Sequence, residues 1–140
     1  MTANHKSSNI ITQNCPCCSG QVFHVCCQPL LDKKAHAASA LALMRSRFTA
    51  FSLGRLDYIN DTQKPNNTTY SNTDTASKTT TTEWLKLEII RAPKPLPPYQ
   101  KATVTFKAYY KKGGIEGVLH EKSSFCKFAN KWYYIKGKTL

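Results

Sequence analysis

Hydrophobic residues recur at helical spacing early in the chain and at strand spacing later. Ala37, Leu41, Met44, Phe48 and Phe51 follow one another at intervals of four, three, four and three residues, the spacing of one apolar helix face. This stripe predicts a helix over about residues 36–53, which Gly54 can end. A second, shorter helix is expected over residues 56–62, because Pro65 cannot continue it.

The period changes to two from Glu83 onward. Leu85, Leu87 and Ile89 alternate with Trp84, Lys86 and Glu88. Ala102, Val104, Phe106 and Ala108 alternate with lysines and threonines, so both segments predict strands with one buried face. Residues 66–82 are rich in Thr, Asn and Ser and predict a surface loop, and a proline-rich connection fills residues 93–98. Gly113-Gly114 and Asn130 predict hairpin turns, and Gly117 is the expected bulge in the long strand over residues 115–128.

Helices followed by an antiparallel meander give an α+β fold, with the amphipathic helix lying across a curved sheet. The chain has 140 residues, of which 41% are hydrophobic, enough for one core with a small appended module. No apolar stretch approaches the length of a membrane span.

Five of the six cysteines lie between positions 15 and 27. Cys15, Cys17, Cys26 and Cys27 can supply the four thiolates of a structural zinc site, and a tetrathiolate also accepts iron. The alternative is a disulfide framework. Adjacent cysteines rarely bridge each other, however, and the first fourteen residues lack the apolar core of a signal peptide. The pattern therefore favours a metal site in a reducing cytoplasm.

The same residues carry a resemblance to a known family. The run C-P-C-x-S-G followed by C-C resembles the SEC-C zinc motif, which also occurs in the preprotein-translocase ATPase. Further matching segments are Leu43 to Phe51, Asp57-Tyr58, Thr82 to Leu85, His120 to Phe125 and Trp132 to Gly137. Together they resemble the bacterial YchJ-like family. The resemblance implies a zinc knuckle over residues 10–32 and an NTF2-like (cystatin-like) domain over residues 33–140.

The chain departs from the family pattern in three places. Cys18 stands where the family usually has glycine, which makes it a rival ligand or a redox-active thiol beside the expected metal. Gln63-Lys64-Pro65 replaces a Trp-His-Pro triplet, and the second SEC-C motif of some relatives does not occur.

Charge constrains the partners. Twenty Lys and Arg against eight acidic residues give a net charge of +12, which favours acidic or polyanionic partners. The run from Lys127 to Lys138 interleaves lysines with Phe128, Trp132, Tyr133 and Tyr134, the composition of a platform for single-stranded nucleic acid. Alternating aromatic residues in a strand more often face a core, so we favour a core role for these aromatic residues over nucleic-acid binding.

An enzymatic or ligand-binding pocket is the other alternative. Its candidate residues are those that the fold could direct toward an NTF2-like cavity: Arg45, Arg47, Asp57, Tyr58, Trp84, His120 and Glu121. A structural ion pair between an arginine of the long helix and His120 or Glu121 is the favoured reading of these charges. The sequence contains no nucleophile or cofactor motif, and Cys126 is expected to be a small core residue.

These observations favour a small zinc-binding protein whose knuckle is a non-enzymatic interaction module. In the translocase ATPase the related motif contacts an export chaperone and associates with ribosomes, so the resemblance implies an export-linked or ribosome-linked partner. Two alternatives stay open: a pocket protein with ligand-binding, hydrolase-like or isomerase-like activity, and a protein that binds single-stranded or ribosomal RNA through its basic surface. NTF2-like sheets also pair into dimers, so a homodimer is compatible with the resemblance.

Overall fold

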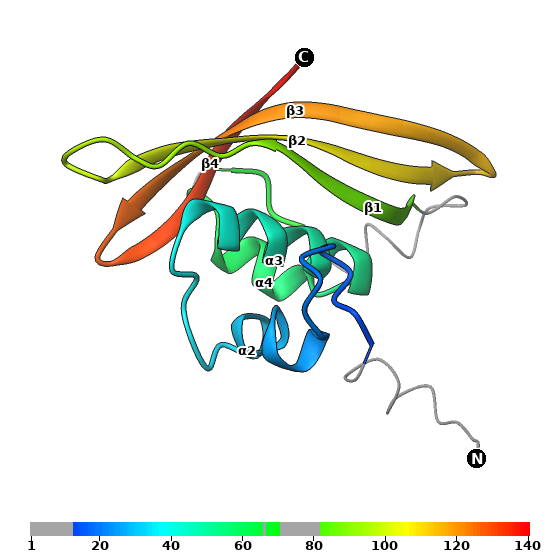
Figure 1. Ribbon diagram of the computed structural model, residues 1–140, viewed down its shortest axis with the longest axis horizontal. Helices are drawn as coiled ribbons and strands as arrows, with labels where there is room; N and C mark the ends of the chain where they lie inside the picture. The colour runs from blue at the N-terminus through cyan, green and yellow to red at the C-terminus, as the bar shows by residue number, and fades with distance from the viewer. Residues whose placement is uncertain (1–12, 66, 71–81) are drawn as a thin grey trace.

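The computed structural model describes residues 13–65, 67–70 and 82–140. Four strands form one antiparallel sheet in the order β1-β2-β3-β4, and all described helices cover the same face of it (Figure 1). The elements are η1 (Phe23–Val25), α2 (Gln28–Leu31), α3 (Ala40–Leu53), α4 (Leu56–Asp61), β1 (Thr82–Arg91), β2 (Lys101–Lys112), β3 (Ile115–Phe128) and β4 (Lys131–Thr139). The predicted α+β meander is confirmed. No helix in these ranges is long and apolar enough to cross a membrane.

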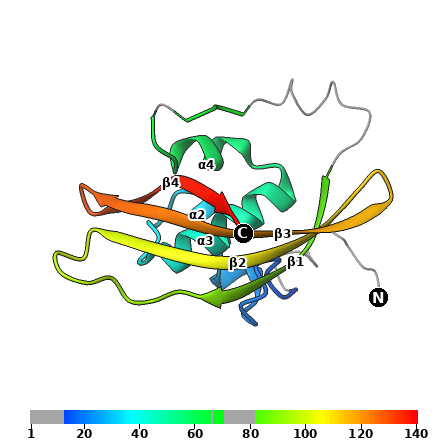
Figure 2. The ribbon, with the colours of Figure 1, turned by 90° about the horizontal axis from the view of Figure 1, so that it is seen from above.

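Tight turns join the last three strands, as the turn residues predict. Gly113 and Gly114 link β2 to β3 with φ angles of 59° and 80°, and Ala129 and Asn130 link β3 to β4 with φ angles of 51° and 65°. Two successive residues with positive φ match the twist of antiparallel strands. The sheet therefore runs as a continuous ribbon whose long strands are visible side by side in Figure 2.

The core lies between the sheet and α3. Val104, Phe106 and Ala108 alternate along β2 as predicted and are buried, and Phe125 of β3 lies on the same face. Trp84 of β1 packs against Phe48 of α3 with ring centroids 6.0 Å apart. The alternation of apolar residues thus fixes which face of the meander meets the helices.

Bulges shift the predicted alternation in two strands. The register slips between Trp84 and Lys86, so Trp84 shares the inner face with Leu87, and Leu85 is 44% exposed instead of buried. The bulge expected at Gly117 is wrong, because Gly117 pairs in register with Tyr110. The register shift between β3 and β4 lies at Ser124 and Phe125, and the extra residue, Ile135, is on β4. Gly117 instead leaves room for Tyr110, whose ring would lie 2.7 Å from an added Cβ.

Helix α3 starts four residues later than the apolar stripe predicts. Ser39 has an extended backbone, and its hydroxyl accepts a hydrogen bond from the backbone N–H of Ala42, so it caps the helix. The helix ends at Gly54, whose φ of 75° is left-handed, as predicted. The predicted stripe is incomplete: Leu41 and Phe51 are only partly buried, whereas Leu43, Ser46, Thr49 and Ala50 are fully buried. The cause is that α3 contacts the sheet, α2 and α4, and so is covered on several sides.

Candidate metal centre

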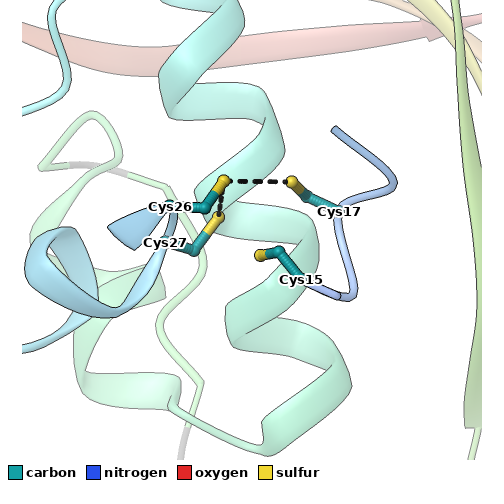
Figure 3. A group of neighbouring side chains, drawn as sticks. All are labelled: Cys15, Cys17, Cys26 and Cys27. Atoms are coloured by element: carbon teal, nitrogen blue, oxygen red, sulfur yellow. Dashed lines mark hydrogen bonds between the residues drawn. The ribbon is translucent and has the colours of Figure 1, made fainter. Parts of the chain in front are cut away.

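The first described residues form a small hairpin that brings the cysteines together. Asn14 pairs with Val22, and the backbone N–H of Cys15 donates to the carbonyl of Gln21 at 2.7 Å. Gly20, with a φ of 92°, lies in the turn of this hairpin, where glycine adopts a left-handed backbone without strain. Cys26 is the C-cap residue of η1 and Cys27 is the N-cap residue of α2, and both face the hairpin (Figure 3).

The four predicted ligands meet at one point beside α3. The Sγ atoms of Cys15, Cys17, Cys26 and Cys27 all lie within 4.8 Å of one another. The Cys26 Sγ lies 3.6 Å from the Sγ of Cys17 and 3.9 Å from that of Cys27. Zinc–sulfur bonds of about 2.3 Å in a tetrahedron place sulfur atoms about 3.8 Å apart, so this spacing suits one metal ion. The chain therefore holds four cysteines arranged to bind a metal.

The protonation of these thiols is mutually linked. Burial raises the pKa of Cys26 to about 11, and the neighbouring sulfurs of Cys17 and Cys15 also raise it. Hydrogen bonds from Cys15 and Cys27 hold the pKa of Cys17 well below its usual range. Crowded thiols cannot all ionise without a cation, and a divalent metal supplies that charge at the shared centre. The residues present thus fit a zinc or iron ion held by all four sulfurs.

Polar groups from α3 and from the hairpin itself lie around the sulfurs. The hydroxyl of Thr49 lies 3.6 Å from the Cys15 Sγ and donates to the Cys27 Sγ at 3.4 Å. Arg45 donates from Nη1 to the carbonyl of Cys17 at 2.6 Å, and the Ser19 hydroxyl lies 3.2 Å from the Cys26 Sγ. Such contacts orient metal ligands. Thr49 was not predicted and Arg45 was expected in a pocket, because nothing in their spacing relates α3 to the hairpin. Ser19 was not predicted as a contact of the sulfurs, although it lies within the cysteine motif.

Cys18 lies outside the group of four. Its side chain is exposed, and its Sγ accepts a hydrogen bond from the backbone N–H of Leu87 at 3.5 Å. Its φ of 64° is left-handed, which accounts for the glycine that the family resemblance implies at this position. Cys126, the sixth cysteine, is half-buried on β3, far along the chain from the hairpin.

The two arginines of α3 do not form the expected ion pair with His120 or Glu121 in the described part of the chain. Arg45 binds the hairpin, as described above. Arg47 is buried and donates to the carbonyl of Ile59 at 2.9 Å and to the Thr62 hydroxyl at 2.8 Å. Burial lowers the pKa of Arg47 to about 10. Both arginines therefore tie α3 to neighbouring segments through carbonyl and hydroxyl oxygens.

The remaining pocket candidates are dispersed. Asp57 lies on the surface and pairs with Arg55, which lowers the pKa of the carboxyl group. The Tyr58 hydroxyl is buried, 2.7 Å from that of Ser46, and Trp84 packs among the aromatic rings of the core. Glu121 accepts a hydrogen bond from Ser123, while His120 lies on the opposite face of β3. The fold does not bring these seven residues to one site.

A cleft of about 290 Å³ lies on the helix side of the sheet. Its walls come from the segment after α2, from α4 and from the start of β4, and include Lys33, His36, Asp61, Lys131 and Trp132. Tyr58 is the sole residue of the predicted pocket that lines it. The Nε1 of Trp132 is buried and has no hydrogen-bond partner among the described residues.

Comparisons with known proteins agree with this architecture. A family model described as "YchJ, middle NTF2-like domain" matches residues 39–137. A UPF0225 protein of Geobacter sulfurreducens is 33% identical, with 91% of this chain aligned to 80% of that protein. A UPF0225 protein of Shewanella sp. strain MR-4 is 37% identical, over 91% of this chain and 82% of the relative.

Two solved structures share the fold. The solution structure of a SEC-C motif containing protein from Rhodopseudomonas palustris superposes with a TM-score of 0.80 at 34% identity, covering 91% of this chain and 99% of that one. The crystal structure of a SEC-C motif containing protein from Psychrobacter arcticus gives a TM-score of 0.74 at 27% identity, covering 94% and 85%. With its cysteine cluster, its sheet and these relatives, the chain belongs to the YchJ-like UPF0225 family and carries that family's NTF2-like α+β domain.

Proposed function

We propose that this protein is a cytoplasmic interaction module and that a structural zinc ion fixes the shape of its cysteine hairpin. The observation that carries the proposal is the convergence of four cysteine sulfurs within 4.8 Å. A tetrahedral zinc ion bound to all four has no open position for water or substrate, unlike a catalytic zinc. The metal would then fix the shape of the hairpin rather than take part in a reaction.

The metal-bearing segment also presents apolar side chains to solvent. Val25 of η1 is 60% exposed and Val22 is 36% exposed, and Cys18 of the same cysteine segment is exposed as well. We define Cys18, Val22 and Val25 as the knuckle surface. Exposed apolar side chains on a rigid, metal-fixed segment suit docking to another protein. The positive net charge favours an acidic partner, such as an export chaperone or a ribosome-bound protein.

The proposal is tested by capture from cell extract with the zinc-loaded protein and a Val25→Asp variant that retains every cysteine. A specific acidic partner should be captured by the wild type and lost with Val25→Asp, because a charge at the knuckle surface opposes apolar docking. Val118→Asp is the matched control, since Val118 is 48% exposed on the far face of the sheet. Equal capture by all three proteins would contradict a role for the knuckle surface.

A second candidate function, binding of a small molecule, is favoured by Trp132. Its buried Nε1 donor lacks a partner, and the residue lines the 290 Å³ cleft. A ligand with a hydrogen-bond acceptor would satisfy this group. A screen of small carboxylates and phosphate esters by thermal shift tests it: a ligand of the cleft should stabilise the wild type but not Lys131→Gln, and should act equally on Val25→Asp. The absence of any such ligand would remove this candidate.

A further inference from the structure

The face of the sheet opposite the helices carries a concentration of positive side chains. We define the basic sheet face by six residues that the register places there: Arg91 on β1, Lys101 and Lys107 on β2, Lys122 on β3, and Lys136 and Lys138 on β4. The alternate positions Val104, Phe106 and Ala108 are buried against the helices, which directs their neighbours outward. No described helix covers this outer face (Figure 1).

Three of these positive residues share one row across the sheet. Arg91 pairs with Thr105, Thr105 with Lys122, and Lys122 with Lys138, which makes one row across all four strands. Like charges directly opposite each other in a sheet repel. Within the described residues, ion pairs form at Lys33 and Arg55, and none involves the basic sheet face.

Acidic groups on the same face do little to offset this charge. Glu88 lies opposite Lys107, but its carboxylate accepts the hydroxyl hydrogen of Tyr109 at 2.9 Å. Glu83 and Glu116 both lie opposite Lys111, close to the β2–β3 turn and away from the row through Lys122. The centre of the face therefore presents uncompensated cations that a bound polyanion would neutralise.

The chemistry of the face distinguishes between its candidate occupants. A second copy of the chain, docked face to face, would oppose lysine with lysine. A protein interface needs a water-excluding apolar centre, whereas Thr103, Thr105 and Ser124 lie between the basic residues. Hydroxyl and ammonium groups together are typical of contacts to phosphate oxygens. Outward side chains recur about every 6.6 Å along a strand, so a linear polyanion can meet several of them in succession.

We propose that the basic sheet face binds the phosphate backbone of single-stranded RNA. An open four-stranded sheet is wide enough to carry a single strand across it. Tyr109, an aromatic residue on this face, is held by Glu88 and lies under the ammonium group of Lys86, 5.3 Å from its ring centroid. Recognition therefore rests on phosphates, with little preference among bases. The surface is separate from the knuckle surface, so this activity is independent of the proposed protein partner.

Binding of a fluorescent oligouridylate, followed by anisotropy over a range of salt concentrations, tests the proposal. The double variant Lys122→Gln, Lys138→Gln should bind on the order of tenfold more weakly, and its plot of log affinity against log salt should be shallower by about 1.4, or about 0.7 per lost contact. The matched control is Lys34→Gln, Lys64→Gln. It removes the same charge from two exposed lysines in segments that follow the helices, and should bind like the wild type.

Several outcomes would overturn the proposal. They are an equal loss in both double variants, equal affinity for polyglutamate of matched charge, tighter binding of duplex than of single strands, and a salt-resistant dimer that excludes the oligonucleotide. The Val25→Asp variant should bind RNA normally. If Val25→Asp loses protein capture but keeps RNA binding, the two surfaces act separately. If Val25→Asp captures the partner normally while the Lys122/Lys138 variant loses RNA binding, only the knuckle proposal is contradicted.

Discussion

Single backbone and side-chain contacts decide how well the metal centre is held. The convergence of the four cysteines could be predicted from the sequence, because closely spaced cysteines point to a shared metal ion. Their supporting groups could not be predicted. Thr49 and Arg45 lie on α3 and reach the hairpin only because the fold places that helix beside it. Such long-range contacts leave no local pattern in a sequence.

Cys18 offers the first test at this scale. Replacing it with glycine should keep metal binding and change the free energy of unfolding by up to about 1 kcal/mol in the stabilising direction, because glycine adopts a left-handed φ without strain. Urea denaturation of the zinc-loaded protein measures the effect. Cys18→Ala serves as the control, since alanine keeps the strained backbone and loses the sulfur. Loss of zinc in either variant would show that Cys18 is a ligand.

Arg45 provides a second test. Its hydrogen bond to the Cys17 carbonyl holds the first arm of the hairpin against α3. Replacement by Met should weaken zinc binding by about 10-fold to 100-fold, the range for supporting contacts around a metal, with all thiols intact. Competition with a chromophoric chelator gives the affinity. Arg91→Met, on the far face of the sheet, should leave it unchanged, and an equal effect of both substitutions would refute this role for Arg45.

At the scale of elements, alternation and turn residues predict the strands well, and bulges limit that prediction. The inward positions of β2 follow the sequence pattern, whereas the bulge after Trp84 turns Leu85 outward. A bulge inserts one residue and reverses the alternation without any distinctive sequence. The apolar stripe locates α3 but misses its start and its full buried surface, because tertiary contacts on several sides bury polar residues such as Ser46 and Thr49.

The N-cap of α3 tests the observed helix start. Ser39→Ala should lower the free energy of unfolding by about 1 kcal/mol, because the N–H of Ala42 loses its acceptor. Ser39→Asp keeps a capping oxygen and should stay close to the wild type. Chemical denaturation compares the three proteins. If the helix began near residue 36, as the stripe alone predicts, both substitutions would have similar small effects.

At the scale of the whole molecule, the knuckle and the domain share one core. The buried set runs without a break from Cys17, Phe23 and Leu31 to Leu43, Phe48 and Phe125. Length and composition predict one core. The expected boundary between knuckle and domain at residue 32, however, gave no indication that Phe23 and Leu31 would belong to that core. A metal bound by the four cysteines would therefore also stabilise the packing of Phe23 and Leu31 in the core of the larger domain.

Chelation should open the knuckle while the sheet and α3 remain folded. Hydrogen exchange with mass spectrometry is expected to show lost protection over residues 13–31 and retained protection over 101–108 and 119–126, with a lower melting temperature because Phe23 and Leu31 leave the core. The Cys27→Ser variant should behave like the chelated protein. Loss of protection throughout the sheet would mean that the domain cannot fold without its metal.

The central claim is that Cys15, Cys17, Cys26 and Cys27 bind one zinc ion. Native mass spectrometry of protein purified without added metal tests it most directly. One zinc per chain is expected for the wild type and for Cys18→Ser and Cys126→Ser, and none for Cys27→Ser. A wild-type protein that takes up no metal when zinc is supplied, or a Cys27→Ser variant that holds zinc as tightly as the wild type, would contradict the account.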